Sequence, residues 1–194
     1  MKIHDLSLYK RLGLVILVSL GFLTFTGCAG TGSWDDEIQW ESLGLSEIPG
    51  EQDYPDAGAI VLFDEGEMSL SAGGEVQFST FRRHRIVKIL NNRGHIYANI
   101  VIPYSPQNEI RNIRARTISP DGEVTELGED DIFDVTMFAD FIWYSDQRAK
   151  RFTMPAVEDG AIIEYSYELQ VSALTYMHNW SFQESVPTLL TRLP

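Results

Sequence analysis

The chain has 194 residues, with 15 Lys and Arg against 28 Asp and Glu, which gives a formal net charge of -13. This excess of acid argues against nucleic-acid binding, because affinity for phosphate backbones depends on clusters of basic residues. A hydrophobic fraction of 44% with 11% aromatics excludes a wholly disordered chain, and the length fits one ordinary domain. The single cysteine, Cys28, excludes an intramolecular disulfide and a cysteine-based metal cluster.

The N-terminus has the features of an export signal. Three basic residues precede an uncharged, apolar stretch over residues 12–27, as in a secretory signal. The stretch is shorter than the roughly 20 residues with which a helix spans a bilayer comfortably. It ends in Phe25-Thr26-Gly27-Cys28, which resembles the lipobox of bacterial lipoproteins. We therefore expect residues 1–27 to be a lipoprotein signal peptide and Cys28 to carry the lipid, with a signal anchor or a buried core segment as the alternative.

The residues after the cysteine predict where the protein resides. Ala29, rather than an Asp, follows Cys28. By resemblance to the sorting preferences of lipoproteins, this indicates the outer membrane, facing the periplasm, with the lipid as the membrane partner. Residues 28–54 are rich in Gly, Ser, Asp and Glu and predict a tether. Its two tryptophans, Trp34 and Trp40, are expected either to dock on the following domain or to bind a partner.

From residue 55 onward, short alternating runs of β-branched and aromatic residues predict strands. The predicted strands cover residues 59–63, 67–70, 76–90, 95–102, 110–118, 123–127, 132–135, 141–144, 148–154, 161–171 and 176–182. Many short strands with turn residues between them favour an all-β fold, an antiparallel β-sandwich or a related multi-stranded sheet over residues 55–194.

Three of the connections are predicted to be tight turns. Asp64-Glu65-Gly66 is expected to join two strands of a hairpin, and residues 91–94 to turn the chain back so that 95–102 pairs with 76–90. Pro120-Asp121-Gly122 is the strongest signal, since Pro presets φ and Gly tolerates positive φ. The apolar ending at residues 187–194 leads us to expect a fragment of a longer protein, although a short natural terminus is the alternative.

A set of features in the same order resembles the bacterial family catalogued as domain of unknown function 3857. The matching features are Pro55-Asp56-Ala57, the strand at 81–90, Pro120-Asp121-Gly122, Phe152-Thr153-Met154-Pro155 and Trp180-Ser181-Phe182-Gln183. The resemblance implies an all-β module without assigned catalysis, usually found before a transglutaminase-like domain in secreted or envelope proteins. That catalytic domain is absent from these 194 residues.

The sequence predicts neither an enzyme nor a cofactor site in this chain. A cysteine mechanism needs a free thiol, and an acylated Cys28 has none. Gly-x-Ser-x-Gly, the usual setting of a serine nucleophile, does not occur. His84 and His95 lie on the two arms of one predicted hairpin and could share a metal ion, but isolated histidines in a sheet are more often surface or core residues. We therefore expect no catalytic residue and no metal.

Two groups of residues stand out in the sequence, an aromatic segment and a basic concentration. The segment containing Phe138, Phe141, Trp143 and Tyr144 is dense in aromatic residues and predicts a surface for an envelope protein or a glycan, with core packing as the alternative. The second group is the basic concentration around residues 82–88. Alternation places Arg83 and Arg85 on the face opposite Arg82, so we expect cross-strand pairing with acidic neighbours rather than one anion-binding patch.

Together these features predict a lipid-anchored cell-envelope β-sandwich with a binding or structural accessory role. Two alternatives remain. The module could be the N-terminal accessory domain of a transglutaminase-like or cysteine-protease-like enzyme whose catalytic domain lies downstream of residue 194. It could also be a structural component that assembles by strand addition at a sheet edge.

Overall fold

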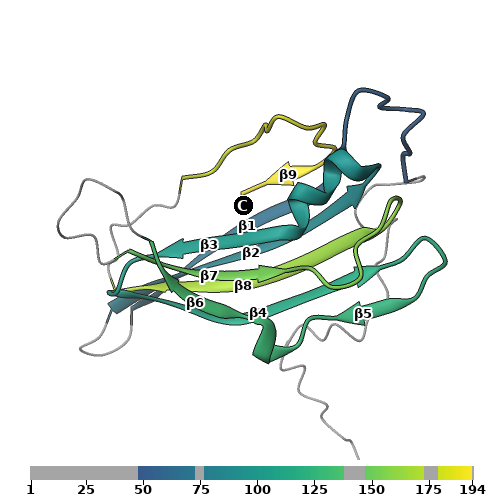
Figure 1. The fold of residues 1–194 in the computed structure, drawn as a ribbon. Coiled ribbons are helices and arrows are strands. Elements are labelled where there is room, and N and C mark those ends of the chain that lie inside the picture. Colours follow the sequence, from purple (N-terminus) through teal and green to yellow (C-terminus); the bar gives the residue numbers. More distant parts are fainter. Residues whose placement is uncertain (1–47, 73–76, 138–146, 173–178, 194) are drawn as a thin grey trace, which may run out of the picture. The chain divides into compact units, whose positions relative to one another are not determined.

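The computed structural model describes residues 48–72, 77–137, 147–172 and 179–193. Within these residues the chain forms two β-sheets (Figure 1). The larger sheet has six strands in the order β5-β4-β8-β2-β1-β9, and the smaller has three in the order β3-β7-β6. The strands are β1 (Ala59–Ala72), β2 (Gln77–Ile89), β3 (Asn99–Tyr104), β4 (Asn108–Ile118), β5 (Val124–Glu126), β6 (Phe133–Thr136), β7 (Arg148–Thr153), β8 (Ile162–Val171) and β9 (Thr191–Arg192). The predicted all-β class is confirmed.

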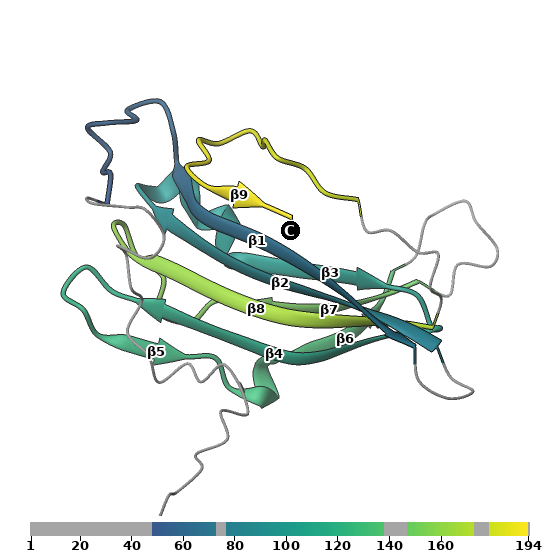
Figure 2. The same ribbon diagram turned by 180° about the vertical axis from the view of Figure 1, so that it is seen from behind.

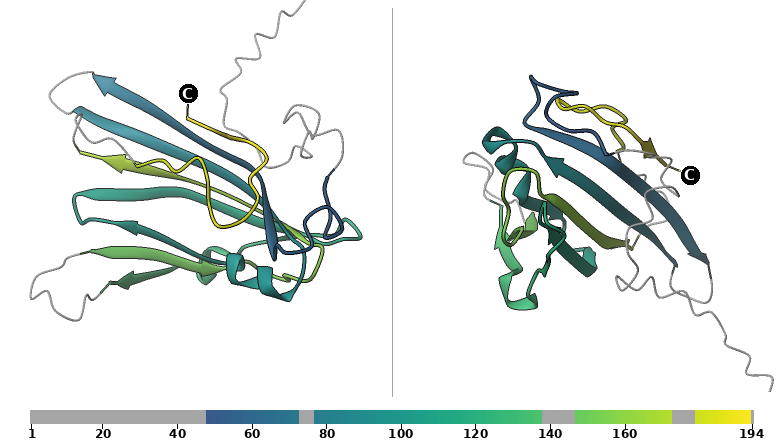
Figure 3. Two further views of the ribbon diagram at one scale, coloured as in Figure 1. Left: turned by 90° about the horizontal axis from the view of Figure 1, so that it is seen from above. Right: turned by 90° about the vertical axis from the view of Figure 1, so that its right-hand side faces the viewer.

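The arrangement is antiparallel with one parallel addition. Strand β8 pairs with β4 on one side and with β2 on the other, both antiparallel, and β1 continues the sheet beyond β2 (Figure 2). The short β9 runs parallel to β1, with Asp64 opposite Thr191. The C-terminal segment therefore lies along the edge of β1, as the views of Figure 3 also show.

The predicted turn at Asp64-Glu65-Gly66 is wrong, because β1 is one continuous strand of 14 residues. Its acidic residues lie opposite basic residues of β2: Asp64 is opposite Arg85, and Glu67 is opposite Arg82. Opposite charges across two strands stabilise the pairing, so the turn-forming residues are held in extended backbone. A register shift between Val61 and Phe63 changes which face each side chain occupies, as a β-bulge does.

The chain after β2 also differs from the prediction. Residues 95–102 do not pair with β2, because both edges of β2 are occupied by β1 and β8. Instead Asn92–Ala98 forms the 3-10 helix η2, capped by the Asn91 side chain, which accepts a hydrogen bond from Arg93 N. The next strand, β3, belongs to the other sheet. Gly94 permits this path because its backbone passes against Gly58. A Cβ at position 94 would clash with the Gly58 carbonyl oxygen.

Several other predictions are confirmed. The predicted strands at 110–118, 148–154 and 161–171 correspond to β4, β7 and β8 within one or two residues. The Pro120-Asp121-Gly122 turn joins β4 to β5, and Gly122 has a φ of 90°. The predicted strand at 176–182 is wrong for residues 179–182, which are not in a strand, and its first part lies outside the described residues. The predicted strand at 141–144 also lies outside them.

The two sheets share one apolar core. From the six-stranded sheet it contains Phe81 and Val87 of β2, and from the three-stranded sheet Ile100 and Phe152, all almost fully buried. The Phe152 ring meets the edge of the Tyr165 ring of β8, with centroids 6.4 Å apart. Within the described ranges, no helix has the length and apolarity needed to cross a bilayer.

Candidate functional site

Two arginines lie on the face of β2 that points into the core. Side chains alternate along a strand, so Arg83 and Arg85 share a face with Phe81 and Val87, which are core residues. The side chain of Arg85 is 8% exposed and that of Arg83 is 22% exposed. Burying a charge is costly unless the charge is paired and hydrogen-bonded, so these arginines require acidic partners.

Asp64 and Glu184 supply those partners from two different elements. Arg83 donates to both carboxylate oxygens of Asp64, at 2.8 and 2.6 Å. Arg85 donates to both oxygens of Glu184, at 2.7 and 2.6 Å, and lies 3.4 Å from Asp64 Oδ2. We call these four residues the arginine cluster. Its two positive and two negative charges cancel.

The surroundings keep both arginines and Glu184 in their usual charge states. Burial alone would lower the pKa of both arginines, but hydrogen bonds to Asp64 and Glu184, together with nearby negative charge, outweigh it and raise the pKa. Hydrogen bonds from Arg85 lower the pKa of Glu184. Burial raises the pKa of the neighbouring Tyr165, so its phenol stays neutral and remains able to donate a hydrogen bond.

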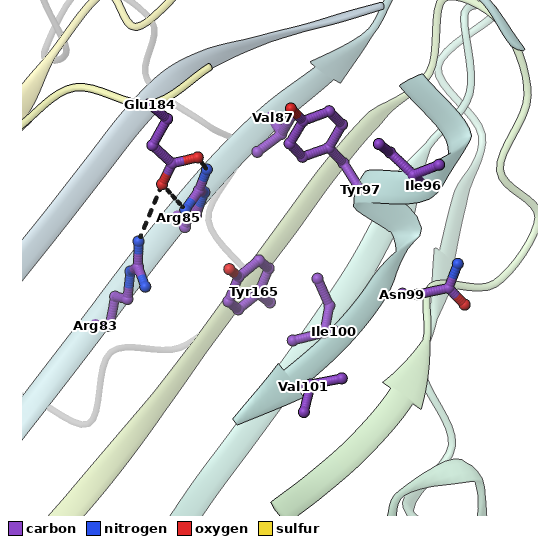
Figure 4. A pocket seen from close by; sticks show the side chains of 10 residues that line it. All are labelled: Arg83, Arg85, Val87, Ile96, Tyr97, Asn99, Ile100, Val101, Tyr165 and Glu184. Carbon is purple, nitrogen blue, oxygen red and sulfur yellow. Dashed lines mark hydrogen bonds and ion pairs between the residues drawn. The ribbon is translucent and has the colours of Figure 1, made fainter. Parts of the chain in front are cut away.

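A surface pocket of about 350 Å³ adjoins the cluster (Figure 4). One side is formed by Arg83, Arg85 and Tyr165 of the large sheet together with Glu184. The other side is formed by residues of η2 and β3: Ile96, Tyr97, Asn99, Ile100 and Val101. The pocket thus combines guanidinium, phenol and amide groups with aliphatic side chains. Such a mixture of an apolar lining and a few polar groups is typical of ligand sites.

Trp180 closes the cluster on the side of β1. Its ring lies over the guanidinium of Arg83, 5.2 Å from ring centroid to Cζ, which is within cation–π range. The ring also meets Phe81 edge to face, and its Nε1 donates to Thr191 Oγ1 at 3.2 Å. The segment carrying Glu184 is therefore anchored to the sheet at Trp180.

A second buried group lies on the opposite face of the large sheet. Glu164 of β8 is 3% exposed and accepts from Arg116 Nε at 2.6 Å, while His84 Nε2 lies 2.7 Å from its other oxygen. The His84 ring also meets the Phe63 ring edge to face. Glu164, Arg116 and His84 therefore form a buried ionic network within the sheet.

The histidine pair weighed as a metal site is not brought together. His84 lies on β2 and contacts Glu164, whereas His95 lies in η2 and contacts Asp159 at 2.9 Å. The predicted hairpin that would have joined them does not form, because η2 replaces its second arm. In the described part of the chain, no group of three or more His, Cys, Asp or Glu is placed to hold a metal ion.

The division of the basic residues between two faces is confirmed. Arg82 points away from the arginine cluster and pairs with Glu67 and Glu168. Sequence reasoning missed that the face shared by Arg83 and Arg85 is the core face. The signal was present, because the same alternation that separates Arg82 from Arg83 also aligns Arg83 with Phe81 and Val87. Nothing in the sequence singles out Glu184.

The other predicted site residues cannot be placed in this geometry. The lipidation residue Cys28 and the candidate recognition residues Phe138, Phe141, Trp143 and Tyr144 lie outside the described residues.

The fold and the cluster define an all-β, two-sheet domain with a charge-balanced arginine pair between its core and a surface pocket. A family model matches residues 77–193, that of a domain of unknown function with solved structure, DUF3857. The chain belongs to this family. The match begins at the first residue of β2 and continues past β9, so it covers both sheets except β1.

Solved structures support the same fold. A crystal structure of a protein from Parabacteroides distasonis, described as a "putative protease", matches with a TM-score of 0.61 and 19% identity. The match covers 70% of this chain but only 28% of that protein. At this identity the likeness shows the fold alone. No curated protein matches the chain.

Proposed function

We propose that this chain is a lipid-anchored accessory module of the cell envelope, which binds a partner and does not itself catalyse a reaction. The observation that carries the binding role is the arginine cluster beside the pocket. Two guanidiniums on the core face of a strand are costly to bury, and Asp64 together with Glu184 compensates them next to a surface pocket of about 350 Å³. Such a site suits recognition of one small chemical group of a partner.

The absence of catalysis is supported by how the polar groups are used. Glu164 is engaged by His84 and Arg116, and the carboxylates of the arginine cluster each bind a guanidinium. A catalytic acid or base needs a proton to exchange with a substrate, whereas each of these carboxylates is bound by an arginine of the same domain. The thiol of Cys28 is unreactive as a nucleophile once it is acylated.

The lipid anchor is tested by changing Cys28 to Ser. We expect the wild-type protein to incorporate an alkyne-labelled fatty acid and to sediment with outer membranes. The variant should lose the label and remain with the soluble fraction, because no acyl chain is then buried in the bilayer. A variant that still sediments with membranes after a salt wash would contradict the anchor.

A specific observation favours a second candidate function, an accessory domain of an envelope enzyme of the transglutaminase-like or cysteine-protease-like class. The domain covers only 28% of the solved structure it resembles, and that protein is described as a "putative protease". Reading the gene past Pro194 separates the two functions. A frame that continues into a segment with a Cys, a His and an Asp would favour the enzyme, and a stop codon there would favour the free-standing module.

A further inference from the structure

The two acids of the arginine cluster are held in different ways. Asp64 is part of the continuous strand β1, and its side chain is 4% exposed. Glu184 comes from the stretch 181–186, which contains no strand, and its side chain is 28% exposed. Asp64 is therefore a fixed counterion of the sheet, whereas Glu184 approaches Arg85 from the solvent side.

The stretch that carries Glu184 is anchored at both flanks. On one side Trp180 packs over Arg83. On the other side the carbonyl of Pro187 accepts a hydrogen bond from Val61 N at 2.9 Å. Between these anchors, residues 181–185 are exposed. A movement of this stretch alone would separate Glu184 from Arg85 and leave both anchors in place.

Arg85 needs an anion when Glu184 leaves. Asp64 already makes a two-oxygen contact with Arg83 and lies farther, at 3.4 Å, from Arg85. Arg85 would then be a buried and poorly compensated charge. The planar guanidinium presents two parallel N–H donors, a geometry that matches the two oxygens of a carboxylate. Because Arg85 and Glu184 both line the pocket, the vacated position is next to it.

We propose that the Arg85 guanidinium is a carboxylate-binding site that Glu184 occupies as an internal ligand, and that a carboxylate of an acidic peptide from a partner displaces it. This inference rests on the binding role proposed above and specifies its ligand class. The pocket volume is at the lower end of the range for small-molecule sites, which suits a residue-sized group.

The remaining pocket residues explain how an external carboxylate can compete with a tethered one. A tethered group acts at an effective concentration on the order of millimolar, so a free acetate ion alone is a poor competitor. Ile96 and Val101 line the pocket and are 69% and 49% exposed. Covering them would add apolar burial, and the Asn99 amide adds a hydrogen-bonding group. A peptide of several residues can cover Ile96 and Val101 while its carboxylate binds Arg85.

The test begins with the variant Glu184→Ala, whose thermal midpoint is measured in sodium propionate and in sodium chloride at equal ionic strength. We expect a lowered midpoint that propionate restores in large part and chloride does not. Glu168→Ala is the matched control, because Glu168 also binds an arginine, Arg82, whose side chain is 56% exposed and well solvated. No rescue of Glu184→Ala, or equal rescue of both variants, would overturn the proposal. If Glu184→Ala does not fold, Glu184→Gln is measured in the same way.

The peptide claim is tested by titration with a synthetic peptide of residues 180–186, which contains Glu184, with both ends capped. We expect it to bind the Glu184→Ala protein at least about tenfold more tightly than the same peptide with Gln in place of Glu, and more tightly than it binds the wild type. A third peptide carries Gln and a free C-terminal carboxylate. Its affinity shows whether Arg85 binds a side-chain carboxylate or a terminal carboxylate. Equal affinity for all three peptides would overturn the carboxylate site. It would not affect the proposed accessory role, which the Cys28 and gene-extension experiments test separately.

Discussion

The ring of Trp180 fills the space that a side chain at position 66 would need. A Cβ built on Gly66 would lie 2.7 Å from Cζ3 of Trp180, and also 2.8 Å from the Phe81 ring. Gly66 lies directly opposite Arg83 in the β1–β2 pairing. A glycine inside a strand is unfavourable by itself. Here it admits the indole that covers the Arg83 guanidinium.

Gly66→Ala should therefore destabilise the domain. The added methyl group overpacks a site bounded by two rings, and we expect a loss of about 1–3 kcal/mol in the free energy of unfolding. Urea denaturation monitored by circular dichroism measures it. Gly50→Ala is the control, because a Cβ there would meet its nearest atom only at 4.0 Å. Equal stability of the two variants would show that Trp180 does not need the space.

Asp64→Asn should be far more costly than Glu67→Gln. Both carboxylates are on β1 and bind arginines of β2, but the side chain of Asp64 is 4% exposed and that of Glu67 is 55% exposed. Removing one charge of a buried pair typically costs about 3–5 kcal/mol, and an exposed pair contributes roughly 0–1 kcal/mol. Chemical denaturation of the two variants compares them. A similar small loss in both would mean that the arginine cluster is well hydrated.

Asp134 should make the domain sensitive to acid. Burial alone would raise its pKa, but hydrogen bonds from Tyr104, Lys150 and Arg148 lower the pKa to about 2, from a usual value of 3.8. Between these two values the unfolded chain binds more protons than the folded one, so the free energy of unfolding falls as the pH falls through this window. From about pH 5 upward, well above the unfolded pKa, the contribution is complete.

Urea denaturation at several pH values between 2 and 5 measures this dependence. In Asp134→Asn the slope of stability against pH should be smaller in that window, because the titrating group is gone. Asp159→Asn is a comparison in another part of the surface, where the carboxylate contacts His95. An unchanged slope in Asp134→Asn would show that its hydrogen bonds do not persist in solution.

The aromatic segment around Phe141 and Trp143 remains a prediction for partner recognition. Replacing both residues by Ala should abolish cosedimentation with isolated peptidoglycan or retention on solubilised outer-membrane protein, while the circular dichroism spectrum stays unchanged. Phe133→Ala is the matched control, since this aromatic residue is 59% exposed on β6. Unchanged binding in the double variant would argue against the segment as a recognition surface.

Local sequence patterns were sufficient for much of the fold. The strands β4, β7 and β8 and the turn at Pro120-Asp121-Gly122 follow from alternation and from turn chemistry, which depend on neighbouring residues. The family resemblance rested on the order of such features, and the family match confirms it.

Local sequence patterns do not reveal which strands pair with each other. Asp64-Glu65-Gly66 has the composition of a turn, yet it is extended because β2 places arginines opposite its acids. Residues 92–98 alternate poorly and form η2, since both edges of β2 are already paired. Which strands pair at its two edges, and which charges lie opposite its residues, depend on segments that are distant in the chain.

The candidate site shows the same division. The amino-acid order is enough to place Arg83 and Arg85 on one face of β2, because side chains alternate along any strand. The packing of distant segments makes this face the core face and brings Glu184, 99 residues from Arg85, close enough to neutralise it. Burial of the two guanidiniums demands a nearby carboxylate, but which of the many acidic residues supplies it depends on where the C-terminal segment crosses the sheet.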